Sequence, residues 1–247
     1  MTSGGQAPDR SRSAAVVVAA GASKRMGGIK KEYRPFSVID SEARTVIAAS
    51  VIAFADSGEV DLIVVVIPAQ GENDARMALP SRLLTPDAPV PVLFVPGGAS
   101  RRQSVHNALN ALEGKDITYV YIHDGARPWL TGDLITRLSA EVRRVQAVIP
   151  VTPLVETPKG IDASGSITKH LRRTTIVSAQ TPQVFVFREI LTAHERAAEK
   201  EATEAIEYTD DAEVWGAFIG PVHTIPGSPS NKKITFPEDL PPQGTLS

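Results

Sequence analysis

The chain has 247 residues, no cysteine and a formal net charge of −2, with 26 Lys and Arg against 28 Asp and Glu. The lack of cysteine excludes disulfides, zinc–cysteine sites and a cysteine nucleophile, and it fits a reducing compartment, so we expect a cytoplasmic protein. The balanced charge and an aromatic content of 5% argue against nucleic acid as a partner. No stretch approaches the roughly 18–20 apolar residues of a membrane helix, so we expect no membrane partner.

We expect a single domain over residues 14–240, because the length suits one large α/β domain. Residues 1–13 are small, polar and rich in Gly, Pro and Ser, which predicts a disordered tail, and residues 241–247 have the same character. The apolar run at residues 14–22 follows two arginines, as the apolar part of a signal peptide would. It is rich in Ala and Val and continues into a segment of Gly, Lys and Arg, so we interpret it as a buried strand instead.

Continuous apolar runs alternate with helical spacing up to residue 151. The runs are residues 14–20, 62–67, 92–95, 119–122 and 147–151. The helix signals between them are Ile47, Val51 and Phe54, the segment 74–84, Val105, Leu109 and Leu112, and the segment 133–144. Strands that are apolar on both faces and alternate with helices indicate a mostly parallel sheet covered by helices. We therefore predict a doubly wound, Rossmann-like α/β fold.

The pattern breaks at residues 152–183, which contain three prolines and two glycines. Short β-branched runs at residues 167–168 and 174–177 predict an extended, two-stranded arm rather than another strand–helix unit. Beyond the arm we expect a helix near residues 187–201 and a strand at residues 222–225.

The segment 19–31, directly after the first predicted strand, is the most informative part of the sequence. Its three glycines would let backbone amides approach an anion closely. Its four cations are Lys24, Arg25, Lys30 and Lys31. At the carboxyl end of a strand in an open α/β sheet, this combination favours a polyphosphate ligand, although the spacing matches neither a P-loop nor a dinucleotide fingerprint. The alternative is a surface loop whose cations face solvent.

Two further clusters follow later strands. Residues 97–104, with two glycines, Arg101 and Ser104, come after the third predicted strand and open a helix, and an ordinary tight turn is the alternative. Residues 123–128 follow the fourth strand, and Asp124 there could hold Mg²⁺ on phosphates or simply cap the next helix. His194 and Glu195 begin like a zinc-protease motif, but Ala198 stands where the second histidine is needed.

Taken together, these motifs resemble a known family over residues 14–240. The pattern A-A-G-x-x-x-R-M-G followed by K-x-Y is shared with many sugar-phosphate nucleotidyltransferases. The later patterns P-G-G-x-x-R-x-x-S-V, H-D-G-A-R-P, T-P-Q-x-F and N-x-K-I-T-x-P-E-D-L occur in the order seen in 2-C-methyl-D-erythritol 4-phosphate cytidylyltransferases. The full set is specific to that family and its sister, the ribitol-5-phosphate cytidylyltransferases.

The resemblance implies an enzyme of non-mevalonate isoprenoid biosynthesis that couples CTP to 2-C-methyl-D-erythritol 4-phosphate. Its products would be 4-diphosphocytidyl-2-C-methyl-D-erythritol and pyrophosphate, its cofactor Mg²⁺, and its assembly a homodimer that exchanges the arms at residues 152–183. The reacting phosphate is already anionic near pH 7, so the reaction needs positioning and cations rather than a general base. Ribitol 5-phosphate as the acceptor, and a non-catalytic nucleotide-binding module, are the two alternatives.

The same resemblance assigns roles to individual residues. Arg25 and Lys31 would stabilise the transition state at the α-phosphate, and Asp124 would serve the metal and the ribose. The nucleotide-binding set is Ala19, Ala20, Gly21, Gly98, Arg101, Ser104, Asp124 and Gly125. The sugar-phosphate set is Arg127, Thr157, Arg173, Thr181, Thr209 and Lys233, with Arg173 supplied by the partner's arm. The family's helix after residues 237–240 is absent, which concerns dimer packing rather than chemistry.

Overall fold

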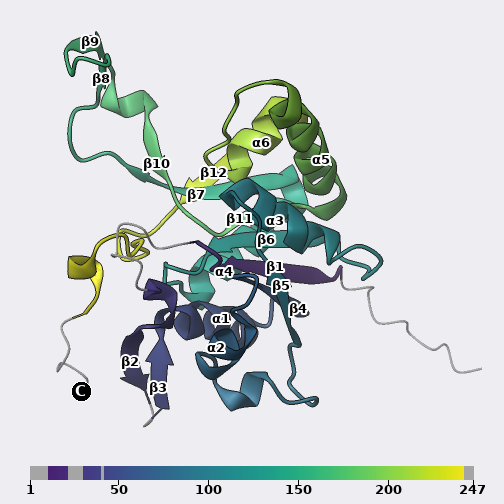
Figure 1. Cartoon of the computed structure of the whole chain (residues 1–247). Coiled ribbons are helices and arrows are strands. Elements are labelled where there is room, and N and C mark those ends of the chain that lie inside the picture. Colours follow the sequence, from purple (N-terminus) through teal and green to yellow (C-terminus); the bar gives the residue numbers. More distant parts are fainter. Residues whose placement is uncertain (1–10, 22–29, 40–41, 242–247) are drawn as a thin grey trace, which may run out of the picture.

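A mixed, mostly parallel sheet forms the centre of the molecule (Figure 1). The computed structural model describes residues 11–21, 30–39 and 42–241. Within these residues the sheet has the strand order β10–β7–β11–β6–β1–β4–β5, and β12 pairs in parallel with β7. The bounds are β1 Ser13–Val18, β4 Leu62–Ile67, β5 Val92–Pro96, β6 Tyr119–Asp124, β7 Ala147–Pro153, β10 Val177–Ala179, β11 Gln183–Val186 and β12 His223–Pro226. Within this sheet, the antiparallel pairings all involve β10 or β11.

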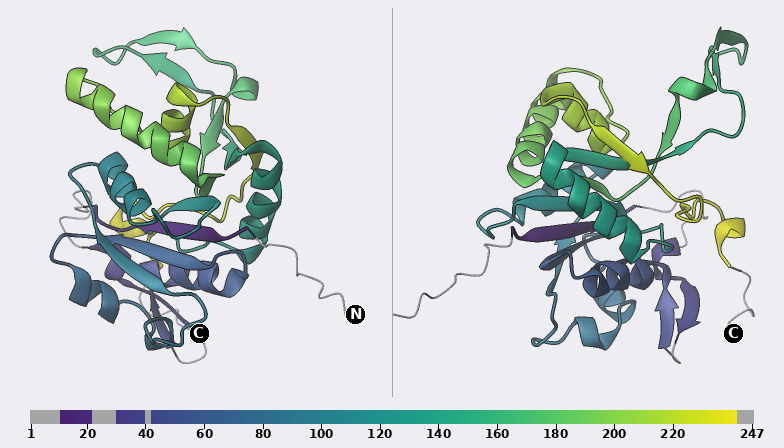
Figure 2. Two further views of the ribbon diagram at one scale, coloured as in Figure 1. Left: turned by 90° about the vertical axis from the view of Figure 1, so that its right-hand side faces the viewer. Right: turned by 180° about the vertical axis from the view of Figure 1, so that it is seen from behind.

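Helices cover both faces of the sheet, as the sequence predicted (Figures 1 and 2). The helices on one face are α1 Val46–Ser57, α2 Glu72–Met77 and α4 Gly132–Val145. Those on the other face are α3 Arg101–Asn110, α5 Phe187–Thr203 and α6 Asp211–Phe218. Successive residues of β1 point to opposite faces, so Ala15 and Val17 join the first core while Ala14 and Val16 join the second. This explains why the strand is an unbroken apolar run.

The predicted strands and helices up to residue 151 are found, with two corrections. Ser13 does not belong to a tail: it is the first residue of β1 and is buried. The predicted helix at residues 74–84 is two elements, because α2 ends at Met77 and a 3-10 helix, Ser81–Leu83, follows Pro80. A proline disfavours helical backbone at the residue before it, which breaks the segment at this point.

The arm is shorter than predicted. Residues 152–153 belong to β7, β10 pairs with β7 in the central sheet, and Gln183 begins β11. Between them, the hairpin of β8 Lys159–Ile161 and β9 Ile167–His170 forms a separate two-stranded sheet that stands away from the rest of the chain (Figures 1 and 2). The large apolar residues exposed along this excursion are Val155, Ile161, Ile167, Leu171 and Val177. No helix in the described parts of the chain is long and apolar enough to cross a membrane.

A second hairpin, β2 Pro35–Ile39 and β3 Glu42–Thr45, was not predicted. It packs beside α1 and follows the 3-10 helix Lys31–Tyr33 directly. The glycine-rich segment therefore leads from the end of β1, through residues 22–29 that lie outside the described part, into this hairpin.

Candidate active site

The carboxyl ends of β1, β4, β5 and β6 meet at one edge of the sheet. Val18 lies opposite Asp124, and backbone hydrogen bonds join Gly125 N to Val18 O at 2.9 Å and Ala19 N to Val66 O at 2.8 Å. Gly97 N likewise donates to Ile67 O at 2.8 Å. The three predicted clusters, at residues 19–21, 97–104 and 123–128, are thus brought to a single edge.

The glycine turn at residues 97–98 is packed too closely to accept side chains. A Cβ on Gly97 would collide with the side chain of Ala20 and would lie 2.9 Å from Ser104 Oγ. Gly98 N donates to Ser104 Oγ at 3.1 Å, and that hydroxyl donates to Ser100 O at 2.8 Å. Ser104 therefore fixes the turn, while the backbone of Gly21 and Gly98 is exposed. Exposed backbone between small residues leaves space for a flat ring.

Asp124 stands at the end of β6 within a cluster of three cations. Its carboxylate lies 3.3 Å from Arg101 Nε, 2.8 Å from Lys233 Nζ and 3.6 Å from Arg127 Nε. Burial alone would raise the pKa of Asp124, but the charges of Arg101, Lys233 and Arg127 lower it well below its usual range. The group is therefore ionised at neutral pH, and the cluster carries an excess of positive charge.

The segment 231–234 ties this cluster together. Lys31 Nζ donates to Ile234 O at 2.7 Å, and Ile234 N donates to Ala126 O at 2.8 Å. Arg127 Nη1 donates to Asn231 O at 2.9 Å. Lys31, Arg127 and Lys233 thus converge from three distant parts of the sequence, and only 8% of Lys31 is exposed.

Thr181 and His123 lie behind the cluster. Thr181 Oγ1 accepts a hydrogen bond from Asp124 N at 3.1 Å and bonds His123 Nδ1 at 3.0 Å, and both side chains are buried. Burial lowers the pKa of His123 to about 4, so this ring is neutral at pH 7. Thr181 is placed to orient Asp124, rather than in an open position toward a sugar phosphate.

Lys30 was expected to be one of four cations around a polyphosphate, but the structure places its side chain differently. Its Nζ donates to Ala19 O and Gly21 O, both at 2.6 Å, so it fastens the loop after β1. Burial lowers its pKa, although Glu32 opposes the shift. Arg25, Lys24 and the two glycines at positions 27 and 28 lie outside the described residues.

Asp211 is a member of the cluster that sequence reasoning missed. It is the first residue of α6, is buried, and its Oδ2 lies 2.8 Å from Arg101 Nη2. Its Oδ1 lies 3.3 Å from Nε2 of the buried His194. Burial alone would lower the pKa of Arg101, but the negative charges of Asp211 and Asp124 outweigh the effect of burial and raise the pKa. In the sequence, the two consecutive aspartates directly after Thr209 were the signal that could have pointed to this residue.

The remaining predicted residues are not joined to the cluster within one chain. Thr209 is exposed, and both its N and its Oγ1 donate to Glu213 Oε2 at 2.8 Å. Thr157 and Arg173 lie in the exposed excursion, where Arg173 Nη1 donates to Val155 O at 2.7 Å. Among the described residues, neither makes a hydrogen bond or ion pair with the Asp124 cluster.

One carboxylate at the cluster could help to hold Mg²⁺. No group of three or more His, Cys, Asp or Glu side chains in the described part of the chain could bind a metal ion on its own. Mg²⁺ usually binds through one or two carboxylates together with substrate phosphates, which is compatible with Asp124 alone. Lys233, 2.8 Å away and the most exposed of its three partners, is the cation that would have to move.

Comparison with known proteins identifies relatives over nearly the whole chain. The family model of IspD, 2-C-methyl-D-erythritol 4-phosphate cytidylyltransferase, matches residues 13–243. The bifunctional enzyme IspD/IspF of Bartonella henselae is 35% identical over 227 residues, covering 92% of this chain and 54% of the relative. That of Bradyrhizobium sp. (strain ORS 278) is 38% identical over 232 residues, covering 93% and 55%. The chain thus spans about half the length of these curated relatives.

Solved structures of single enzymes are matched over almost their full length. The 2-C-methyl-D-erythritol 4-phosphate cytidylyltransferase of Francisella tularensis is 27% identical with a TM-score of 0.72, covering 93% of this chain and 97% of that one. The enzyme of the same name from Thermus thermophilus is 26% identical with a TM-score of 0.69, covering 91% and 94%. These matches agree with the sheet order and the helix layers described above.

Proposed function

Because the chain belongs to the 2-C-methyl-D-erythritol 4-phosphate cytidylyltransferase family, we propose that it transfers the cytidylyl group of CTP to 2-C-methyl-D-erythritol 4-phosphate. The products are 4-diphosphocytidyl-2-C-methyl-D-erythritol and pyrophosphate, in non-mevalonate isoprenoid biosynthesis, and we place the enzyme in the cytoplasm. The observation that carries the proposal is the convergence of Lys31, Arg101, Arg127 and Lys233 at the strand edge. A reaction between two multiply charged anions needs such a concentration of cations.

The chemistry follows from the charges. An anionic oxygen of the acceptor phosphate attacks the α-phosphorus of CTP, and the bond from that phosphorus to the oxygen bridging to the β-phosphorus breaks, so pyrophosphate leaves. The nucleophile is already deprotonated, so no general base is required. His123, neutral and bonded to Thr181 Oγ1 and Arg127 O, has a supporting position only. Lys31 and Arg25 supply the cations for the charge that develops at the α-phosphate.

We assign the nucleotide to the edge formed by the glycine turns. The backbone of Ala20, Gly21 and Gly98 surrounds the base, with Ala19, Ser104 and Gly125 keeping the turns close together. Arg101 is held between Asp124 and Asp211 at the same edge. Mg²⁺, when bound to the triphosphate and Asp124, would neutralise phosphate charge and orient the leaving group.

We also propose a homodimer with exchanged arms. Thr157 and Arg173 are exposed on the excursion between β7 and β10 and lack contacts to the Asp124 cluster among the described residues. The apolar side chains exposed beside them, such as Val155 at 81% and Ile161 at 65%, are the kind of surface that a partner subunit covers. The partner's Arg173 would then complete the site for the acceptor phosphate.

Pyrophosphate release tests the proposed reaction directly. It should require both CTP and 2-C-methyl-D-erythritol 4-phosphate, stop in EDTA and resume with Mg²⁺. The kcat/KM should be on the order of 100-fold or more higher for CTP than for ATP or GTP, because the small-residue pocket leaves little room for a purine. Comparable values with ATP would contradict the cytidylyl assignment. Faster turnover of ribitol 5-phosphate would assign the chain to that acceptor, and no release with either acceptor would support a non-catalytic module.

Asp211→Asn should raise the KM for CTP by about 10–100-fold with a much smaller change in kcat. The substitution removes the negative charge nearest to Arg101, and an interaction that involves charged groups contributes about 1.5–3 kcal/mol. Asp133→Asn, which changes an exposed surface pair with Arg137, is the matched control and should leave the KM unchanged. A lower unfolding temperature with an unaltered KM for CTP would show that Asp211 only stabilises the fold.

A further inference from the structure

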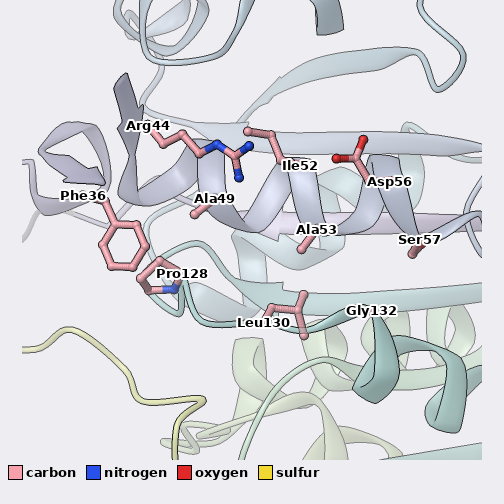
Figure 3. Close-up of a pocket in the computed structure, with 10 residues that line it drawn as sticks. All are labelled: Phe36, Arg44, Ala49, Ile52, Ala53, Asp56, Ser57, Pro128, Leu130 and Gly132. Carbon is pink, nitrogen blue, oxygen red and sulfur yellow. The ribbon is translucent and has the colours of Figure 1, made fainter. Parts of the chain in front are cut away.

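A concave site lies on the side of α1 that faces away from the sheet. It is a cavity of about 290 Å³ bounded by α1, by the β2–β3 hairpin and by the loop between β6 and α4 (Figure 3). This volume is close to the lower end of the roughly 300–1,000 Å³ of small-molecule sites. The cavity shares none of its lining residues with the Asp124 cluster, so it is a separate site.

The floor of the cavity is apolar and the charges lie at its ends. Ala49 and Ala53 on α1 leave the space open. One wall is formed by Phe36 and Arg44 of the hairpin, and the other by Pro128 and Leu130 of the loop before α4 (Figure 3). Figure 3 shows Arg44 over the Ala49 end of the helix and Asp56 at the other end. The stretch of α1 from Ala49 to Asp56 spans about 10 Å along the helix axis.

Arg44 is the cation at this site, and its side chain has no partner among the described residues. Its side chain makes no hydrogen bond or ion pair with any described residue, and its Nε is buried without an acceptor. Asp56, in contrast, is paired with Arg82 at 3.4 Å. An unpaired guanidinium beside an apolar surface favours an anion, and a carboxylate matches its planar geometry with two parallel hydrogen bonds.

The charges at the two ends of the cavity also limit which kind of ligand it can bind. A single arginine faces the cavity, and the carboxylate of Asp56 at the far end would repel a second anionic group. The site therefore fits a monoanion with an apolar body about as long as the floor, rather than a polyphosphate. Since CTP and a sugar phosphate are polar polyanions, neither of the proposed substrates has this chemistry.

We propose that this cavity binds a small amphipathic carboxylate, with its carboxylate on Arg44 and its apolar body over Ala49, Ala53 and Leu130. The two walls lead directly to the candidate active site. Phe36 and Arg44 belong to the hairpin that follows Lys31, and Pro128 follows Arg127 in the chain. Trp129, next in sequence, packs edge-on against Phe36 with ring centroids 5.1 Å apart, so the two walls touch. A ligand that moves either wall therefore also acts on the segment that carries Lys31 or Arg127 of the Asp124 cluster.

Calorimetric titration with 4-phenylbutyrate, and with uncharged 4-phenylbutan-1-ol as the matched probe, tests the proposal without any measurement of activity. The wild-type chain should bind the acid at least ten-fold more tightly than the alcohol. Arg44→Gln should weaken binding of the acid by about ten-fold or more and leave the alcohol unchanged. Arg144→Gln, at an arginine that is 75% exposed and pairs with Glu141, is the control and should bind like the wild type.

Ala53→Trp locates the binding, because the larger side chain fills the cavity from the middle of its floor. Both probes should lose at least ten-fold in affinity, while the thermal unfolding curve shows a folded protein. Equal affinity of the wild type for acid and alcohol would overturn the assignment of Arg44. Binding that survives Ala53→Trp, or no binding of the acid to the wild type, would overturn the site itself. None of these outcomes depends on the cytidylyl transfer reaction.

Discussion

Replacing Lys31 with alanine should lower kcat by about 10²–10³-fold while raising the KM for CTP far less. Removing a single preorganised donor to a developing oxyanion typically costs about 3–4 kcal/mol in the transition state. Lys31 is suited to such a role because its ammonium is held in place by Ile234 O at 2.7 Å, with little exposure to solvent. Steady-state pyrophosphate release, supported by a single-turnover measurement of the chemical step, separates the two parameters.

The control for Lys31→Ala has to distinguish the loss of a catalytic charge from a loss of folding stability. Lys200→Ala removes a half-exposed lysine from a surface pair with Glu204 and should leave kcat unchanged. Because Lys31 also anchors the segment 231–234, the unfolding temperature of the variant should be recorded as well. A pure KM effect at full kcat would mean that Lys31 only binds the triphosphate. Arg25→Ala should behave in the same way, since we assign it the same role.

The sheet and its covering helices could be predicted from the sequence because their signals are local and strong. An unbroken apolar run such as residues 62–67 has to be buried on both faces, and it is fully buried as β4. The elements that were missed are short or weakly patterned. β11 has four residues after a proline, and α6 begins with polar residues that are buried through specific partners rather than through apolar spacing.

The candidate site could be predicted only where the motif itself lies at a strand end. Asp124 and the glycine turns were placed correctly at one edge because parallel strands deliver their carboxyl ends together. The pairing of Arg101 with Asp211 joins residues 110 positions apart through the packing of α3, α5 and α6, which no local pattern encodes. Lys30 is a case in which the local motif misleads. The motif resembles a phosphate-binding loop, but the ammonium of Lys30 donates its hydrogen bonds to two carbonyls of the loop itself.

The proposed exchange of arms between subunits predicts that two inactive variants restore activity when they are mixed. Lys31→Ala and Arg173→Ala should each be nearly inactive alone, yet a mixture that exchanges subunits should recover about a quarter of wild-type activity. In an isologous two-fold dimer, half of the dimers in a random mixture are hybrids. Each hybrid has one site with both lesions and one site with Lys31 from one chain and Arg173 from its partner. That second site is intact.

The recovery depends on which chain supplies Arg173, so the experiment distinguishes the two arrangements. If Arg173 acted on the site of its own chain, every site in every dimer would carry one lesion and mixing would restore nothing. Subunit exchange should be confirmed independently, for example by mass spectrometry of differently tagged variants. A mixture of Lys31→Ala with Arg25→Ala is the matched control, because both lesions then lie in the same half of the site and no hybrid site is whole. Recovery in that control would refute the assignment of these two cations to one chain, and no recovery with Arg173→Ala would refute the shared site.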